Sequence, residues 1–138
     1  MSNKTPRFTS AALVGPGVVE LVWDDGTNCR LDLSADVPVG IAAPRIEDWG
    51  NSLEFGGTEV DFSSLELYKR AAWQDGRSLR PEDFRAWRKK VGLSQDQLAK
   101  LFDLSRRTIG YYEDGTLLVP RVVILAMKGY EAELSAAA

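Results

Sequence analysis

The chain has no histidine and only one cysteine, Cys29, among its 138 residues. A single cysteine excludes a disulfide within the chain, and the lack of histidine excludes a histidine-based catalytic dyad and the common zinc sites. We therefore expect no metal site and no cofactor. Cys29 lies on the apolar side of an alternating segment, so we expect it to be a small core residue rather than a nucleophile.

Long apolar segments are also missing. The longest apolar run, Val122 to Met127, is far too short to cross a bilayer, and the first residues lead into no segment with the length of a signal peptide. We expect a cytoplasmic protein without membrane contact. An apolar content of 44% and a charged content of 27% are ordinary for a folded globular chain.

Basic residues are scarce in the first part of the chain only. Residues 1–76 carry 6 basic and 12 acidic side chains, a net charge of −6, whereas residues 77–138 carry 11 basic and 8 acidic ones, a net charge of +3. Such asymmetry is typical of a protein in which one part faces nucleic acid. Chance could also produce it, because +3 is not a strong basic patch.

The first part of the chain has the periodicity of strands. Residues 18–23 alternate with a period of two, residues 8–14 form an earlier strand, and Asp25-Gly26 is a hairpin signal before the alternating residues 29–33. An irregular stretch with Pro38, Gly40 and Pro44 follows. Two short strands, residues 53–55 and 59–62, then flank Gly56-Gly57 and predict a second hairpin. Ser63 and Glu66 open a helix that ends near Trp73, with Leu65, Tyr68 and Ala72 on one side.

Several carboxylates of this part could in principle serve acid–base chemistry: Asp24, Asp25, Asp32, Asp36, Glu47 and Asp48. The hairpin turn already accounts for Asp25, and an exposed strand face accounts for Asp32. No Ser, Cys or Lys stands beside a recognisable base, so we predict no enzyme. Trp23, Trp49 and Trp73 could line a ligand pocket, but core packing is the commoner fate of scattered aromatic residues.

The second part of the chain has the periodicity of helices. Pro81 opens one helix, whose apolar residues are Phe84, Trp87 and Val91, and Gly92 ends it. Ser94 and Gln97 form a capping box for the next helix, in which Leu98, Leu101 and Phe102 make one apolar stripe. Ser105 caps a further helix with Ile109 and Tyr112 inward. A last helix runs from Pro120 to about Leu134 and is apolar on more than one side.

Helix, short break and helix, with Arg106-Arg107 at the start of the second one, is the layout of a DNA-reading helix-turn-helix. The match extends over Gly-Leu-Ser-Gln at residues 92–95, Leu98-Ala99 and Glu113-Asp114-Gly115. On these residues the segment from about Phe84 to about Tyr130 resembles the lambda-Cro-like repressor helix-turn-helix family. One departure is Asp103, at the turn position where that family usually has glycine; Asp tolerates the left-handed conformation better than most residues.

The resemblance implies roles for individual residues. It implies that Gln95 contacts a DNA phosphate and that Arg88 and Glu113 form a buried ion pair that stabilises the fold. We expect Thr108 and Thr116 to contact phosphates as well. The outward residues of the reading helix are expected to contact base edges: Ser105, Arg106, Arg107, Gly110 and Tyr111. Gly110 weakens a helix interior, so either the backbone approaches DNA closely there or a neighbouring side chain needs the room.

The first part of the chain is similar to a small bacterial α+β family of unknown function. The similarity lies in the Trp-Asp-Asp-Gly hairpin of residues 23–26, the Asp-Leu-Ser of residues 32–34 and the Ser-Leu-Glu-Leu-Tyr of residues 64–68. We therefore predict an acidic α+β domain over residues 1–75, a small antiparallel sheet with one helix. A short linker around Gln74–Arg77 separates it from an all-α helix-turn-helix domain over residues 78–138.

The sequence predicts a transcriptional regulator that binds double-stranded DNA as a homodimer, and among regulators it favours a repressor. Two alternatives stay open. The chain could be the antitoxin of a toxin–antitoxin pair, in which the acidic part masks a basic toxin, or it could be an adaptor that uses its helices for protein contact only. A protein partner or a small ligand on the first domain is left open.

Overall fold

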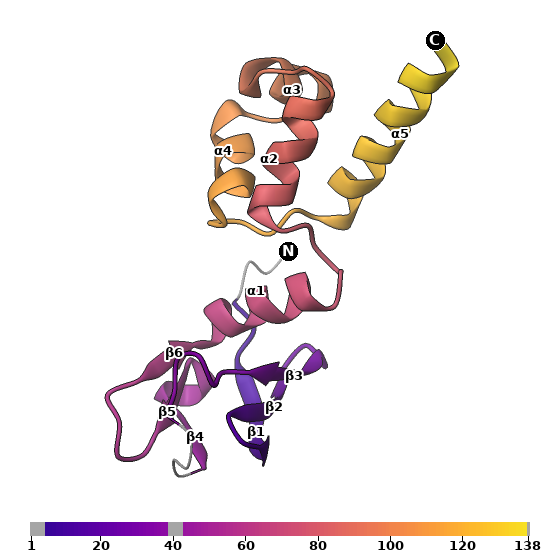
Figure 1. Ribbon diagram of the computed structural model, residues 1–138. Coiled ribbons are helices and arrows are strands. Elements are labelled where there is room, and N and C mark those ends of the chain that lie inside the picture. Colours follow the sequence, from indigo (N-terminus) through magenta and orange to yellow (C-terminus); the bar gives the residue numbers. More distant parts are fainter. Residues whose placement is uncertain (1–4, 39–42, 138) are drawn as a thin grey trace. The chain divides into compact units, whose positions relative to one another are not determined.

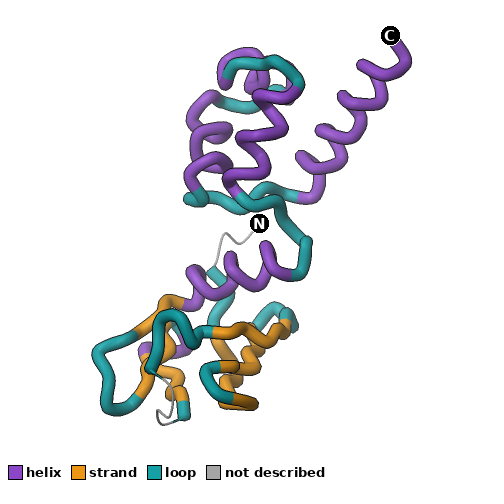
Figure 2. Tube along the Cα trace, in the orientation of Figure 1, coloured by secondary structure: helices purple, strands orange, loops and turns teal. Residues whose placement is uncertain are grey.

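The computed structural model describes residues 5–38 and 43–137, and the chain divides into two compact units, residues 1–72 and 73–138 (Figure 1). The first unit contains β1 (Phe8–Gly15), β2 (Val18–Trp23), β3 (Asn28–Asp32), β4 (Pro44–Glu47), the short 3-10 helix η1 (Asp48–Gly50), β5 (Ser52–Phe55), β6 (Asp61–Ser63) and most of α1 (Ser64–Gln74). The second contains α2 (Pro81–Lys90), α3 (Gln95–Phe102), α4 (Arg106–Asp114) and α5 (Arg121–Ala137). Figure 2 shows strands in the first unit and helices alone after α1. The predicted fold class, α+β followed by all-α, is confirmed.

The strands form two antiparallel sheets, with the orders β1-β2-β3 and β4-β5-β6. Along β2 the side chains of Val19, Leu21 and Trp23 are buried and their neighbours are not, as the period of two predicts. The hairpin between β2 and β3 turns at Gly26, which has a φ of 86°. The Asp25 carboxylate accepts a hydrogen bond of 2.9 Å from the Thr27 N–H and so closes this turn.

The prediction of an irregular stretch before the second hairpin was wrong at β4. Residues 44–47 pair antiparallel with β5, with Ile46 opposite Leu53. Pro44 is the first residue of this strand, which lies at the end of the sheet order, a position where proline is tolerated. Gly40 lies outside the described residues. The hairpin of β5 and β6 forms as predicted, with Leu53 opposite Phe62.

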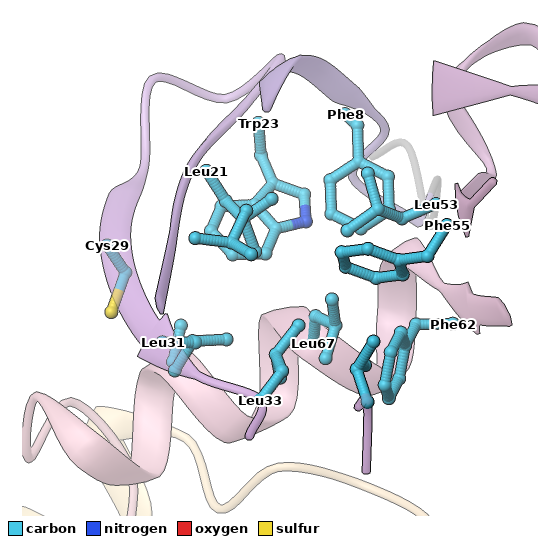
Figure 3. Packing of buried hydrophobic residues seen from close by; sticks show 13 residues of the cluster. Phe8, Leu21, Trp23, Cys29, Leu31, Leu33, Leu53, Phe55, Phe62 and Leu67 are labelled. Carbon is cyan, nitrogen blue, oxygen red and sulfur yellow. The ribbon is translucent and has the colours of Figure 1, made fainter. Parts of the chain in front are cut away.

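The core of the first unit lies between its two sheets and α1 (Figure 3). Figure 3 shows Trp23, Phe8 and Phe55 turned toward one another, with Leu67 of α1 beside them. The Trp23 indole donates a 3.2 Å hydrogen bond to the Ser64 carbonyl, which ties β2 to the start of α1. Cys29 is a buried core residue, as expected.

Two expectations about buried side chains of the first unit were wrong. Trp49 is 88% exposed, because it occupies a tight turn between β4 and β5 whose backbone directs it to solvent. In α1 Ala72 is buried and Tyr68 packs against the core as expected, but Leu65 is exposed, and Leu67 and Ala71 are buried instead. The helix presents the Leu67 stripe to the sheets because the Trp23–Ser64 hydrogen bond sets its first turn against β2.

The second unit has a separate core, built from Phe84, Leu98, Ala99, Ile109, Tyr112, Val119, Val123 and Met127. The rings of Phe84 and Tyr112 meet edge to face with centroids 5.5 Å apart. In α3 the prediction that Leu101 is inward was wrong. The buried stripe includes the small Ala99 instead, and Leu101 is 45% exposed. None of the helices in the described part of the chain is long and apolar enough to cross a membrane.

Candidate nucleic-acid interface

Two N-caps define the helices of the candidate interface. The Ser94 hydroxyl accepts a 3.1 Å hydrogen bond from the Gln97 N–H, and the Gln97 side chain accepts one of 2.8 Å from the Ser94 N–H. This is the predicted capping box at the start of α3. Ser105 caps α4 in the same way, since its hydroxyl accepts a 3.0 Å hydrogen bond from the Thr108 N–H.

The turn between α3 and α4 passes through a left-handed residue, Asp103, with φ 57° and ψ 43°. Its backbone N–H donates to carbonyls of the last turn of α3, and the Leu104 N–H donates to the Ala99 carbonyl over 2.8 Å. These bonds satisfy carbonyls that the helix end would otherwise leave without partners. Asp103 therefore adopts the left-handed conformation that glycine adopts more easily. The turn is preserved, and α4 begins after a break of three residues, 103–105.

α4 has a buried and an outward face. Ile109 and Tyr112 are 0% and 5% exposed, and burial raises the pKa of the Tyr112 hydroxyl. At about 100° per residue, Arg106, Arg107, Gly110 and Tyr111 share the opposite side of the helix. The sequence-predicted base-contact residues are therefore brought together on one face, except that Ser105 stands just before the helix as its cap.

The two arginines of this face differ in their surroundings. Arg106 lies 3.7 Å from the Asp96 carboxylate of α3, and both side chains are more than 60% exposed, so this contact contributes little to stability. Within the described residues, Arg107 makes no ion pair, and its side chain is exposed. Both guanidinium groups can therefore reach an anion or a base edge at little cost in lost protein contacts.

The sequence left two explanations for Gly110: close approach of DNA to the helix backbone, or room for a neighbouring side chain. The structure distinguishes between them. A Cβ atom added there meets no other atom of the described chain within 4 Å. No neighbouring side chain in that part of the molecule needs the room. The backbone of Gly110 is helical rather than left-handed, so its conformation does not demand glycine either. The remaining explanation is that Gly110 leaves the helix backbone uncovered on the outward face of α4, so that another molecule can approach the backbone closely there.

Arg88 of α2 and Glu113 of α4 form a two-bond ion pair, with Nε–Oε2 at 2.7 Å and Nη2–Oε1 at 3.0 Å. Their side chains are only 12% and 7% exposed. The third guanidinium nitrogen, Nη1, donates to the Leu93 carbonyl over 2.9 Å. The hydrogen bonds from Arg88 to Glu113 raise the pKa of the arginine further. This cluster fixes α2, the start of α3 and the end of α4 against each other.

Gln95, the predicted phosphate ligand, is part of the same cluster. Its Nε2 lies 3.4 Å from Glu113 Oε1, so the buried carboxylate orients the amide at the first position of α3. The amide nitrogen keeps a second N–H for an external acceptor. Sequence reasoning missed this link, because Gln95 and Glu113 belong to different helices and their spacing carries no periodic signal.

Thr108 and Thr116, the other predicted phosphate ligands, are placed differently. The Thr108 hydroxyl is 2.8 Å from the Ser105 hydroxyl, so both belong to the cap of α4. Thr116 is exposed just after α4, and its N–H donates to the Asp114 carboxylate over 2.8 Å. Ser105 and Thr108 thus partner each other in the cap of α4. From the sequence a phosphate contact was predicted for Thr108, and this local partner was not.

The carboxylates of the first unit are largely occupied by local partners. Asp25 accepts from the Tyr68 hydroxyl over 2.7 Å, and Asp36 pairs with Arg70 at 3.0 Å. Hydrogen bonds from Ser34 lower the pKa of Asp32. Among the described residues, no three or more His, Cys, Asp or Glu side chains gather in a way that could hold a metal ion.

Comparison with known proteins bears on both units. The model of the helix-turn-helix family matches residues 84–126, which span α2, α3, α4 and the start of α5. The chain is also similar to the crystal structure of "Putative DNA Binding Protein NE0471" from Nitrosomonas europaea. The sequence identity is 25% and the TM-score 0.50, over 96% of this chain and 91% of the other. No curated protein matches the chain. Residues 84–126 of the second unit therefore match the helix-turn-helix that the sequence indicated.

Proposed function

We propose that this chain is a sequence-specific DNA-binding transcriptional regulator that represses by occupying a promoter. The observation that carries the proposal is the outward face of α4. Arg106 and Arg107 are exposed at the N-terminal end of the helix, and one turn further on Gly110 carries no side chain that would keep another molecule from the helix backbone. A helix of this kind enters the major groove and presents its first turns to base edges. The helix-turn-helix family match and the similarity to a protein named for DNA binding support the same assignment.

In this proposal the chain acts in the cytoplasm by binding and catalyses no reaction. Its homodimer reads two half-sites with twofold symmetry, one helical turn of about 34 Å apart or a multiple of it. The N-terminus of α3 approaches the phosphate backbone through Gln95, where the helix dipole favours an anion. The net charge of +3 on residues 77–138 provides the general attraction to DNA.

The test is selection of bound sequences from a random duplex DNA pool by the purified full-length chain. We expect enrichment of a motif with twofold symmetry, and repression of a reporter whose promoter contains that motif. Recovery of no enriched motif at low salt would contradict sequence-specific binding. Increased reporter expression would contradict repression while leaving DNA reading intact.

A second candidate function concerns the first unit, and the observation that favours it is Trp49. This bulky apolar side chain is 88% exposed to solvent. Its backbone φ of 56° also lies in the left-handed region, which bulky residues rarely adopt. In the adjoining sheet Arg45, Glu54 and Asp61 stand opposite one another in register, on the same face as Glu47, so carboxylates outnumber the single cation there. An exposed aromatic ring that follows two acidic residues, Glu47 and Asp48, suits a basic protein, as an antitoxin would require.

For this second function the test is co-purification of the chain with the product of a neighbouring small basic gene. We expect Trp49→Ala to abolish a complex that the wild type forms, while DNA binding stays unchanged. A complex that survives this substitution would exclude Trp49 from the contact.

A further inference from the structure

α5 has one face on the core of its unit and one face without a neighbour. Val123 and Met127 are buried, and Tyr130 packs edge to face against Trp87 at 6.4 Å. On the other side Val122 is 70% exposed and Leu125 is 51% exposed. Figure 1 shows α5 leading away from α2, α3 and α4, and residues 131–137 are all exposed.

The exposed face has the spacing of a coiled-coil seam. It carries only apolar or small residues, at alternating intervals of three and four: Val122, Leu125, Gly129, Ala132 and Ala136. These are the a and d positions of a heptad repeat. In the same register the core-facing residues Val123, Ile124, Met127 and Tyr130 fall at b, c and f, on the opposite side. The helix is therefore apolar on two sides. The core of the unit accounts for one apolar side, and the exposed seam is left without an explanation in the single chain.

We propose that this seam pairs with the α5 seam of a second copy of the chain, in parallel. A β-branched residue at a with leucine at d, as at Val122 and Leu125, favours parallel two-stranded pairing. The charges flanking the seam agree. Lys128 falls at g and Glu133 at e, so in a parallel pair each Lys128 faces Glu133 of the second copy. The proposal deepens the proposed function, because it specifies the surface through which two reading helices are joined.

An antiparallel pair fits the charges less well. It brings g positions against g positions, so Lys128 would face another Lys128 or the neutral Ser135 of the second copy and lose its contact with Glu133. Lys128 and Glu133 are both exposed, so the parallel contact between them is available. The electrostatic pattern therefore selects one orientation of a contact that the apolar residues alone leave ambiguous.

The seam is short, and its length sets the expected strength of the dimer. From Val122 to Ala136 it extends about 21 Å at 1.5 Å per residue. A stable interface buries roughly 800 Å² on each partner, which a single pair of short helices with small residues at three of five positions does not supply. We expect the free chain to dimerise in the micromolar range and operator DNA to strengthen the pairing.

The first experiment compares two exposed leucines of the same helix by analytical ultracentrifugation of the full chain without DNA. Leu125 lies on the seam, and Leu134, which is 43% exposed, lies at f on the opposite side. Leu125→Lys should weaken the dimer at least about tenfold, as expected for a charge placed in an apolar seam. Leu134→Lys should leave it unchanged. Circular dichroism checks that both variants remain folded.

The second experiment tests the orientation. Lys128→Glu and Glu133→Lys each place like charges across a parallel seam and should each weaken the homodimer. Mixed together, the two variants form a heterodimer in which both charge pairs attract, so association should return to the wild-type level. In an antiparallel pair Glu133→Lys would instead leave the homodimer unchanged, since e positions then face e positions and Glu133 meets no charged residue of the second copy.

A wild-type chain that stays monomeric throughout the micromolar range, with and without selected DNA, would overturn the proposal. So would a dimer that Leu125→Lys does not weaken or that Glu133→Lys does not weaken. These results are independent of DNA reading, which is measured on α4. A monomer that still selects a DNA motif refutes the α5 pairing alone, and a dimer that selects none refutes the regulator assignment alone.

Discussion

Glu113 at the end of α4 holds Arg88 of α2 through two hydrogen bonds, of 2.7 and 3.0 Å, in a largely buried setting. The same carboxylate also orients Gln95 at the start of α3. One acidic residue thus connects α4 with α2 and with the start of α3. The position of the outward face of α4 depends on this carboxylate.

Removal of Glu113 should therefore act on stability first. Glu113→Ala leaves the Arg88 guanidinium buried without its counter-charge, which typically costs about 3–5 kcal/mol. We expect a clearly lower melting temperature and weaker binding of all DNA sequences. The double variant Arg88→Met/Glu113→Leu is the matched control, because it removes both charges and should recover part of the stability. A Glu113→Ala chain as stable as the wild type would contradict the role given to the pair.

Asp103 gives a prediction in the opposite direction. Its left-handed backbone, with φ 57°, costs a residue with a Cβ roughly 1–2 kcal/mol that glycine does not lose. Asp103→Gly should raise the free energy of unfolding by about 1 kcal/mol, less whatever the more flexible unfolded chain takes back. Asp103→Ala keeps the Cβ and should be no more stable than the wild type. Chemical denaturation of the three chains measures the order, and stabilisation by alanine as large as that by glycine would contradict the explanation.

The parts of the fold that follow from neighbouring residues could be predicted from the sequence. The Ser94–Gln97 capping box, the Ser105 cap and the alternation along β2 depend on residues at most a few positions apart. The same holds for the inward side of α4, where Ile109 and Tyr112 are the only apolar pair at helical spacing that faces away from Arg106-Arg107.

The parts that depend on distant partners could not be predicted. β4 exists because Pro44–Glu47 pairs with β5, and its short proline-led sequence carries no strand signal of its own. Leu101 is exposed while the smaller Ala99 is buried, because the packing of α4 against α3 decides the inward side. The Gln95–Glu113 contact was missed for the same reason, because it joins two helices, whereas the Thr108–Ser105 contact is local and could have been predicted from the cap. Composition cannot show that a side chain is already engaged by its neighbours.

Gly110 offers a test in which stability and binding should move apart. Gly110→Ala adds a methyl group that meets no atom of the described chain, in a helix where alanine is preferred by about 1 kcal/mol. The melting temperature should rise. If the helix backbone lies against DNA at this point, affinity for the selected motif should fall, and Gly110→Leu should lower it further without loss of stability. A stabilised variant that binds as tightly as the wild type would show that DNA does not approach Gly110 closely.

The reading mechanism itself is tested by comparing α4 with the start of α3. Arg106 or Arg107 should make a bidentate contact to guanine O6 and N7, which contributes about 1–3 kcal/mol of discrimination. The corresponding alanine variant should relax specificity at one base position in each half-site. Gln95→Ala removes the proposed phosphate contact and should weaken binding to the selected motif and to scrambled DNA by similar factors.

Salt dependence separates these contacts further. Loss of an arginine that also neutralises a phosphate should reduce the slope of log affinity against log salt by about one, whereas the neutral Gln95 should leave the slope unchanged. Arg85→Ala is a suitable control, since this exposed arginine lies on α2, outside the predicted contact set. Fluorescence anisotropy on both DNAs at several salt concentrations supplies all four comparisons. If Arg106→Ala and Arg107→Ala both bind the selected motif as tightly as the wild type, α4 does not read the DNA.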